Sequence, residues 1–213
     1  MPSPIGHALA GVAVAWSAEQ LPGSAGLRRP LPLVATLSCV ALAVLPDADL
    51  IYLPIHRTVT HSIGATILVT IVAIAVTGKV TRLSTLRRGQ DRRNPARGTT
   101  LPGQEEALPA RAHVAWGLVL MCAAAHVSHL LLDWLGADPS WPFGIQALWP
   151  FSHRWFISGW NLFPSTERRH VFSAASIAVN LKAAAWEIAI MGPIVLALGL
   201  WRRRGDASST HGA

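Results

Sequence analysis

Five long apolar stretches constrain this chain more than any other feature of its sequence. They occupy residues 5–18, 31–45, 63–77, 112–132 and 171–201 of 213. Only 14% of the residues are charged, whereas a typical soluble domain has about 25%. This composition excludes a disordered chain, a collagen-like repeat and a coiled coil, and it predicts a protein that crosses a membrane several times.

The lengths of the stretches bear on how they cross. The last two are long enough to span a bilayer, whereas the first three are nearer 15 residues and fall below the ~18–20 of a full span. They are therefore short spans lengthened by flanking residues, or partly re-entrant segments. Only helices and closed barrels satisfy the backbone in lipid, and these runs lack the alternation of barrel strands. We predict an all-α fold: one membrane-embedded bundle of about five hydrophobic helices over residues 1–213.

The positive charges predict which way the bundle faces. Thirteen of the 18 Lys and Arg residues lie in segments 19–30 and 78–111 and after residue 201. By the positive-inside rule these parts face the cytoplasm. The N-terminus and segments 46–61 and 133–170 then lie outside, and five crossings satisfy every segment at once. Residues 1–6 hold no Lys or Arg, so we expect no cleaved signal peptide.

The basic segments also indicate which binding partners the protein could have. The net charge is +7, which suits either nucleic acid or an anionic membrane surface. Because segment 78–111 lies between apolar spans, we expect a flexible cytoplasmic loop against lipid and no specific nucleic-acid partner. The tail at 205–213 is expected to be disordered.

Ionisable residues gather at the predicted outer ends of the apolar stretches, where they need partners or a function. They are His7, Asp47, Asp49, His56, His61, His129 and Asp133. The topology came from Lys and Arg alone, so this clustering is a partly independent result. Imidazole and carboxylate together suit zinc, manganese or iron. His129 and Asp133, four residues apart, share one helix face. We therefore predict a shared metal site.

Other features of the sequence receive simpler interpretations. If residues 47–49 are extended, only one of the two aspartates points into a given site. Five of the nine tryptophans lie in segment 133–170, which indicates an interfacial belt or a lipid-facing pocket. The remaining histidines are assigned no role in the site. They are His113, His126, His153, His170 and His211.

Five motifs occur in a characteristic order: GHALAG, LPDADL, HRTVTHS, HLLLDWLG and WPFGIQALWPFSHRWF. From residue 6 to about residue 156, the chain resembles the YdjM-type family of bacterial inner-membrane, metal-dependent hydrolases. That family is distantly similar to zinc-dependent phospholipases C and single-strand nucleases, which hold zinc with His and Asp ligands. The resemblance implies a multi-pass protein of the bacterial inner membrane with His7, Asp47 or Asp49, His61, His129 and Asp133 as ligands.

On this basis we expect a hydrolase that holds one to three divalent ions, zinc first and manganese second. A metal-activated water would attack a phosphoester or lipid-like substrate at the outer face. We assign Asp47 as a ligand and Asp49 as the general base, with the reverse left open. His56 is a further catalytic candidate, and Arg57 would hold an anionic oxygen. Membrane lipids and a small-molecule or lipid substrate are the expected partners.

Two other classes of function compete with the enzyme. A divalent metal transporter fits an HxxxD pair within a span, but transport sites usually lie near the bilayer midplane. A structural membrane protein with a stabilising metal differs from an enzyme in having a closed coordination sphere.

Overall fold

The computed structural model describes all residues except 21–31, 52–55, 93–106, 169, 171 and 211–213. Its elements are α1 (Pro4–Ala18), α2 (Pro32–Val44), the 3-10 helix η2 (Leu45–Ile51), α3 (Ile63–Arg92), α4 (Ala107–Leu135) and α5 (Ala174–Thr210). No strand occurs in the described part of the chain, where β pairing is limited to two isolated bridges. The predicted all-α bundle of about five hydrophobic helices is confirmed.

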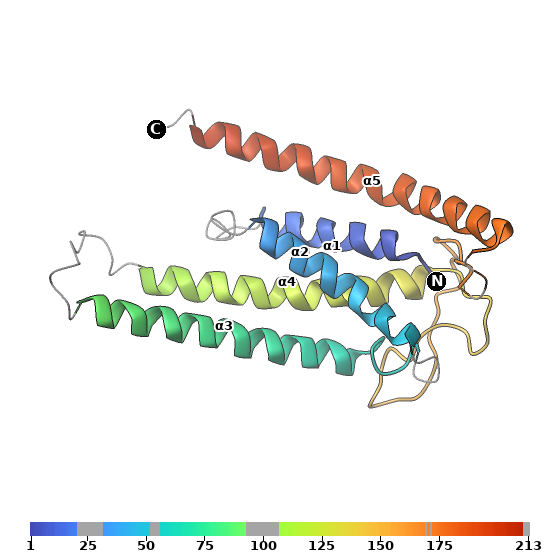
Figure 1. The fold of residues 1–213 in the computed structure, drawn as a ribbon, viewed down its shortest axis with the longest axis horizontal. Helices are drawn as coiled ribbons and strands as arrows, with labels where there is room; N and C mark the ends of the chain where they lie inside the picture. The colour runs from blue at the N-terminus through green and yellow to red at the C-terminus, as the bar shows by residue number, and fades with distance from the viewer. Residues whose placement is uncertain (21–31, 52–55, 93–106, 169, 171, 211–213) are drawn as a thin grey trace.

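The helices lie side by side and alternate in direction along the chain (Figure 1). α1 packs against α2, α4 and α5, and α3 packs against α4. One end of the bundle therefore collects the start of α1, the end of η2, the start of α3, the end of α4 and the start of α5. These are the five ends that the positive-inside rule places outside.

Within the described ranges, four helices are long and apolar enough to cross a membrane, and α1 is a shorter apolar helix. The candidate spans are Leu33–Leu50, Ile63–Leu83, Ala115–Leu135 and Ala174–Arg204. Only 11% of the residues in the α3 span are buried within the protein, so most of its apolar side chains are free to face lipid. The chain is a multi-pass membrane protein.

Small residues let the central helices approach closely, as is common in membrane bundles. Ala15, Ala43 and Ala125 are fully buried between helices. At Gly11 an added Cβ would lie 2.8 Å from the carbonyl oxygen of Cys39 and from Cα of Val40. The contact between α1 and α2 therefore requires glycine at residue 11.

Two segments expected to be irregular are largely helical. α3 continues to Arg92 and α4 begins at Ala107. The flexible loop predicted over residues 78–111 is therefore wrong for residues 78–92 and 107–111, which are helical. Residues 93–106 lie outside the described residues. α5 continues to Thr210, so the disordered tail predicted at 205–213 is wrong up to that residue. In both cases a helix that has already formed extends by adding one hydrogen bond per residue, which costs far less than starting a new helix.

The segment between α4 and α5 folds back over the end of the bundle where these helix ends meet. Its backbone bonds the start of α3 through Ile63 N to Ala147 O at 2.8 Å and Gly64 N to Trp149 O at 3.0 Å. An added Cβ at Gly64 would lie 2.9 Å from Trp149 O, so this close contact also needs glycine. These bonds position the HRTVTHS turn that precedes α3.

Candidate metal centre

The seven predicted His and Asp residues meet at this end of the bundle. His7 comes from the first turns of α1, Asp47 and Asp49 from η2, His56 and His61 from the turn before α3, and His129 and Asp133 from α4. Because η2 is a 3-10 helix, the extended conformation considered for residues 47–49 is wrong. His7, His61, His129 and Asp133 are fully buried.

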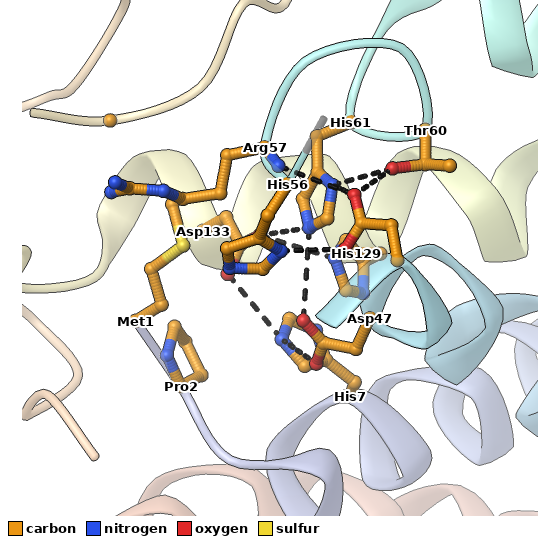
Figure 2. A network of polar contacts seen from close by, with 12 residues as sticks. Met1, Pro2, His7, Asp47, His56, Arg57, Thr60, His61, His129 and Asp133 are labelled. Atoms are coloured by element: carbon orange, nitrogen blue, oxygen red, sulfur yellow. Dashed lines mark hydrogen bonds and ion pairs between the residues drawn. The ribbon is translucent and has the colours of Figure 1, made fainter. Parts of the chain in front are cut away.

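Side chains from α1, η2, the turn before α3 and α4 point toward one another here, as Figure 2 shows. Asp133 lies at the centre: its Oδ2 is 3.1 Å from His129 Nε2 and 3.3 Å from His61 Nε2, and its Oδ1 is 3.4 Å from His7 Nε2. Asp47 closes the cluster, 3.7 Å from His61 Nε2 and 3.9 Å from His7 Nε2. The name "five-residue cluster" is used below for His7, Asp47, His61, His129 and Asp133.

The arrangement of these nitrogen and oxygen atoms suits a bound metal ion better than it suits hydrogen bonds among the side chains themselves. All three Nε2 atoms and all four carboxylate oxygens of the cluster are buried without a hydrogen-bond partner, although buried polar atoms are almost always paired. Ligand atoms about 2.1 Å from zinc lie about 3.4 Å apart in a tetrahedron, and the separations here are 3.1–3.9 Å. The described groups that could hold an ion include His7 with Asp47 and His129, and His61 with His129 and Asp133.

Hydrogen bonds from outside the cluster orient two of its imidazoles. His129 Nδ1 lies 2.7 Å from the carbonyl oxygen of Ala43, which can only accept, so Nδ1 carries the proton and Nε2 faces the cluster. His61 Nδ1 lies 3.0 Å from Thr60 Oγ1 and 3.3 Å from Asp49 Oδ2. Such outer partners fix the tautomer and orientation of ligating histidines.

The charge around His61 acts on its pKa. Burial lowers this pKa, but the carboxylates of Asp133, Asp47 and Asp49 outweigh burial and raise the pKa well above its usual value. Without a metal, the surrounding carboxylates thus favour a proton on His61. A divalent cation among the same carboxylates would take the place of that proton.

Asp49 faces away from the five-residue cluster and holds the turn before α3. It accepts from His56 Nδ1 at 2.6 Å, from the Arg57 backbone N–H at 3.3 Å and from the Thr60 hydroxyl. The structure thus separates the two aspartates that the sequence left interchangeable. Asp47 lies in the five-residue cluster, and Asp49 lies behind His61.

Arg57 does not reach the five-residue cluster. Its backbone is in the left-handed region at φ 65°, and its guanidinium points away from the ligands (Figure 2). There it pairs with Asp138 and stacks over the Trp155 ring at 5.8 Å. Asp138 itself is held by the Gly144 backbone N–H at 2.7 Å. The expected contact of Arg57 with a substrate oxygen has no support in this placement.

Arg168 is the arginine that the structure brings to the cluster instead. Its Nη1 lies 3.7 Å from Asp47 Oδ1 and 3.1 Å from His56 Nε2. Since a guanidinium only donates, His56 Nε2 accepts, and His56 Nδ1 donates to Asp49. Arg168 lies in an irregular segment with no motif around it, so the sequence carried no signal beyond its charge.

Glu187 also has a defined place next to the site. Its buried carboxylate accepts from the backbone N–H groups of Ser3 at 2.6 Å and Gly6 at 2.9 Å, and from the Ser3 hydroxyl. It therefore caps the start of α1, where the helix dipole favours negative charge. An added Cβ at Gly6 would lie 2.8 Å from Glu187 Oε2, which explains the glycine before His7.

The remaining histidines lie outside the five-residue cluster where they are described. His126 is buried one turn before His129 and bonds Thr66 Oγ1 at 2.9 Å. His153 and His170 are exposed. His211 lies outside the described residues, and the side chain of His113 is not described.

A profile of the family described as YdjM inner membrane protein matches residues 1–205, which extends the resemblance from two thirds of the chain to nearly all of it. Neither the curated proteins nor the solved structures contain a match. With its five apolar helices and its buried His and Asp cluster, the chain belongs to the YdjM family of inner membrane proteins.

Proposed function

We propose that this chain is a membrane-embedded, metal-dependent hydrolase that acts on a phosphoester or lipid-like substrate. The observation that supports this most is the five-residue cluster, in which seven buried nitrogen and oxygen atoms face one another without hydrogen bonds. His7, Asp47, His61, His129 and Asp133 would hold the ion. A divalent ion supplies Lewis acidity and lowers the pKa of a bound water to about 7.

The remaining polar residues divide between positioning and proton transfer. Asp49 accepts from three groups in the turn and lies 3.3 Å from His61 Nδ1, so we assign it to positioning His61 and His56 in place of the general base first expected. His56 carries its proton on Nδ1, held by Asp49 at 2.6 Å, and its Nε2 accepts from Arg168 Nη1 at 3.1 Å, so Nε2 would become available for proton transfer when Arg168 turns to a substrate anion. An imidazole oriented by a carboxylate in this way is suited to accept and return a proton.

The surroundings favour a substrate that approaches from the membrane surface. Several aromatic side chains in the segment between α4 and α5 are exposed, at 83% for Trp141, 79% for Phe151, 77% for Trp160 and 94% for Phe172. Aromatic side chains at the ends of spans sit at the level of lipid headgroups. By the positive-inside rule, the site and the N-terminus lie outside and the C-terminus lies in the cytoplasm.

The position of the cluster favours an enzyme over a transporter. Transport sites usually lie near the bilayer midplane, whereas these ligands lie at one end of the bundle. Glu187, the acidic residue that a midplane pathway would need, caps α1.

Metal content tests the proposal directly. Wild type, His61→Ala and His129→Ala are purified in detergent, reloaded with zinc or manganese and measured by elemental mass spectrometry. His126→Ala is the matched control, because it removes a buried imidazole from the same helix outside the cluster. We expect stoichiometric metal in the wild type and in the control, and loss in both cluster variants.

The metal-loaded protein is then assayed with aryl phosphates and with phospholipids in nanodiscs. Hydrolysis that His61→Ala abolishes would support the enzyme. A wild-type protein that binds no metal after reloading would overturn the proposal.

A further inference from the structure

We propose that Arg168 binds the anionic phosphoryl group of the substrate beside the metal ligands, which makes the substrate a phosphoester in place of a neutral carboxylic ester. This inference rests on the proposed function and adds its substrate class. It also transfers to Arg168 the role that the sequence pattern suggested for Arg57.

The location of Arg168 is the first argument. Side-chain exposure is 0% for His7, His61, His129 and Asp133 and 5% for Asp47, and it rises to 11% for His56 and 25% for Arg168. The side of the cluster that meets the surroundings is therefore the side where Arg168 and His56 lie. A substrate that reaches the ligands from this side passes the guanidinium.

The pairing of Arg168 is the second argument. Arg57 has Asp138 as a hydrogen-bonded carboxylate, and Arg202 has Glu19 at 2.8 Å. Among the described residues, the carboxylate oxygen that lies nearest to Arg168 is Asp47 Oδ1, at 3.7 Å from Nη1. That separation is beyond a hydrogen bond, and Asp47 is itself a ligand of the proposed ion.

The charge balance follows from this pairing. When a divalent ion binds the Asp47 carboxylate, that negative charge no longer balances Arg168. The guanidinium keeps its positive charge, and its remaining partners are one imidazole nitrogen and two oxygens, all uncharged. These are His56 Nε2 at 3.1 Å, the carbonyl oxygen of Pro2 at 3.3 Å and Thr166 Oγ1 at 3.4 Å. A planar guanidinium with several N–H donors matches two oxygens of a phosphoryl group.

Binding of inorganic phosphate tests this inference without relying on turnover. Zinc-loaded wild type, Arg168→Gln and Arg168→Lys are titrated with inorganic phosphate by calorimetry in a neutral detergent, and metal content is measured on the same samples. Arg154→Gln is the matched control, because Arg154 is an exposed arginine of the same segment. We expect Arg168→Gln to weaken phosphate binding at least tenfold with full metal content, Arg168→Lys to retain part of it and the control to match the wild type.

A second arm identifies the source of the phosphate. Nanodiscs of phosphatidylcholine with and without phosphatidic acid are compared in competition with inorganic phosphate. Competition by discs of either composition, lost in Arg168→Gln, indicates a lipid headgroup, whereas no competition by either disc indicates a soluble phosphate ester.

Three results would overturn the inference. Phosphate affinity equal in Arg168→Gln and wild type, with metal retained, would refute Arg168 and leave the metal centre intact. Loss of metal from both Arg168 variants would make Arg168 a support of the centre. A wild type that holds no metal would refute the proposed function first, and this inference with it.

Discussion

The imidazole of His129 donates from Nδ1 to the backbone carbonyl of Ala43 at 2.7 Å. This one bond joins α4 to the last turn of α2 and turns the Nε2 lone pair toward Asp133. It also ties the geometry of the cluster to helix packing, since Ala43 is fully buried at that contact. A change in the fit of α2 against α4 would therefore change the geometry of the five-residue cluster.

Asp49→Asn is expected to weaken metal binding without abolishing it. Asn presents an N–H₂ group in place of one acceptor oxygen, so His61 and His56 lose part of their support. Loss of such an outer partner typically costs 10–100-fold in metal affinity. Competition with a chelator measures the affinity, and Asp47→Asn is expected to cause a larger loss. Equal affinity in wild type and Asp49→Asn would contradict the positioning role.

Metal affinity is expected to rise with pH. The carboxylates around His61 overcome burial and hold its pKa well above the usual value, so the metal-free protein carries a proton there near neutral pH. Metal binding releases this proton, which corresponds to about tenfold in affinity per pH unit. Calorimetry in buffers of different ionisation enthalpy counts the proton. An affinity that is constant between about pH 6 and pH 8 would refute this account.

Glu187→Gln is expected to destabilise the bundle while leaving the metal in place. The amide turns one acceptor into a donor that faces the N–H groups of Ser3 and Gly6. An unsatisfied buried donor costs about 1–3 kcal/mol. Thermal unfolding in detergent measures the loss, with Lys182→Gln as an exposed control on the same helix. Metal uptake into vesicles that disappears in Glu187→Gln would instead favour the transporter.

Gly11→Ala is expected to destabilise the contact between α1 and α2. The new Cβ would lie 2.8 Å from backbone atoms of Cys39 and Val40 in α2. Such overpacking costs about 1–3 kcal/mol of stability. Gly78→Ala is the matched control, because its Cβ meets nothing within 4 Å, and Ala in a helix is favoured by about 0.5–1 kcal/mol. Unfolding by denaturing detergent compares the two variants. Equal stability would show that α1 and α2 are not in close contact in the membrane.

Apolar run length and charge placement predicted the number of helices, their alternation and the end of the bundle where the polar residues gather. These properties follow from composition, because each helix must satisfy its own backbone in lipid and each cytoplasmic segment carries Lys and Arg. The pairing of His129 with Asp133 could also be predicted from the sequence, because residues four apart lie on one face of a helix. The ends of α3 and α5 were missed because helices propagate past the apolar residues that identify them.

Only the tertiary structure separated Asp47 from Asp49, set Arg57 against Asp138 and brought Arg168 to the cluster. The two aspartates have the same chemistry and are two residues apart, so their roles depend on the 3-10 turn and on what lies on each side of it. Arg168 meets His56 across 112 residues of chain. No local pattern encodes that contact, because it results from how the segment between α4 and α5 folds back over the end of the bundle.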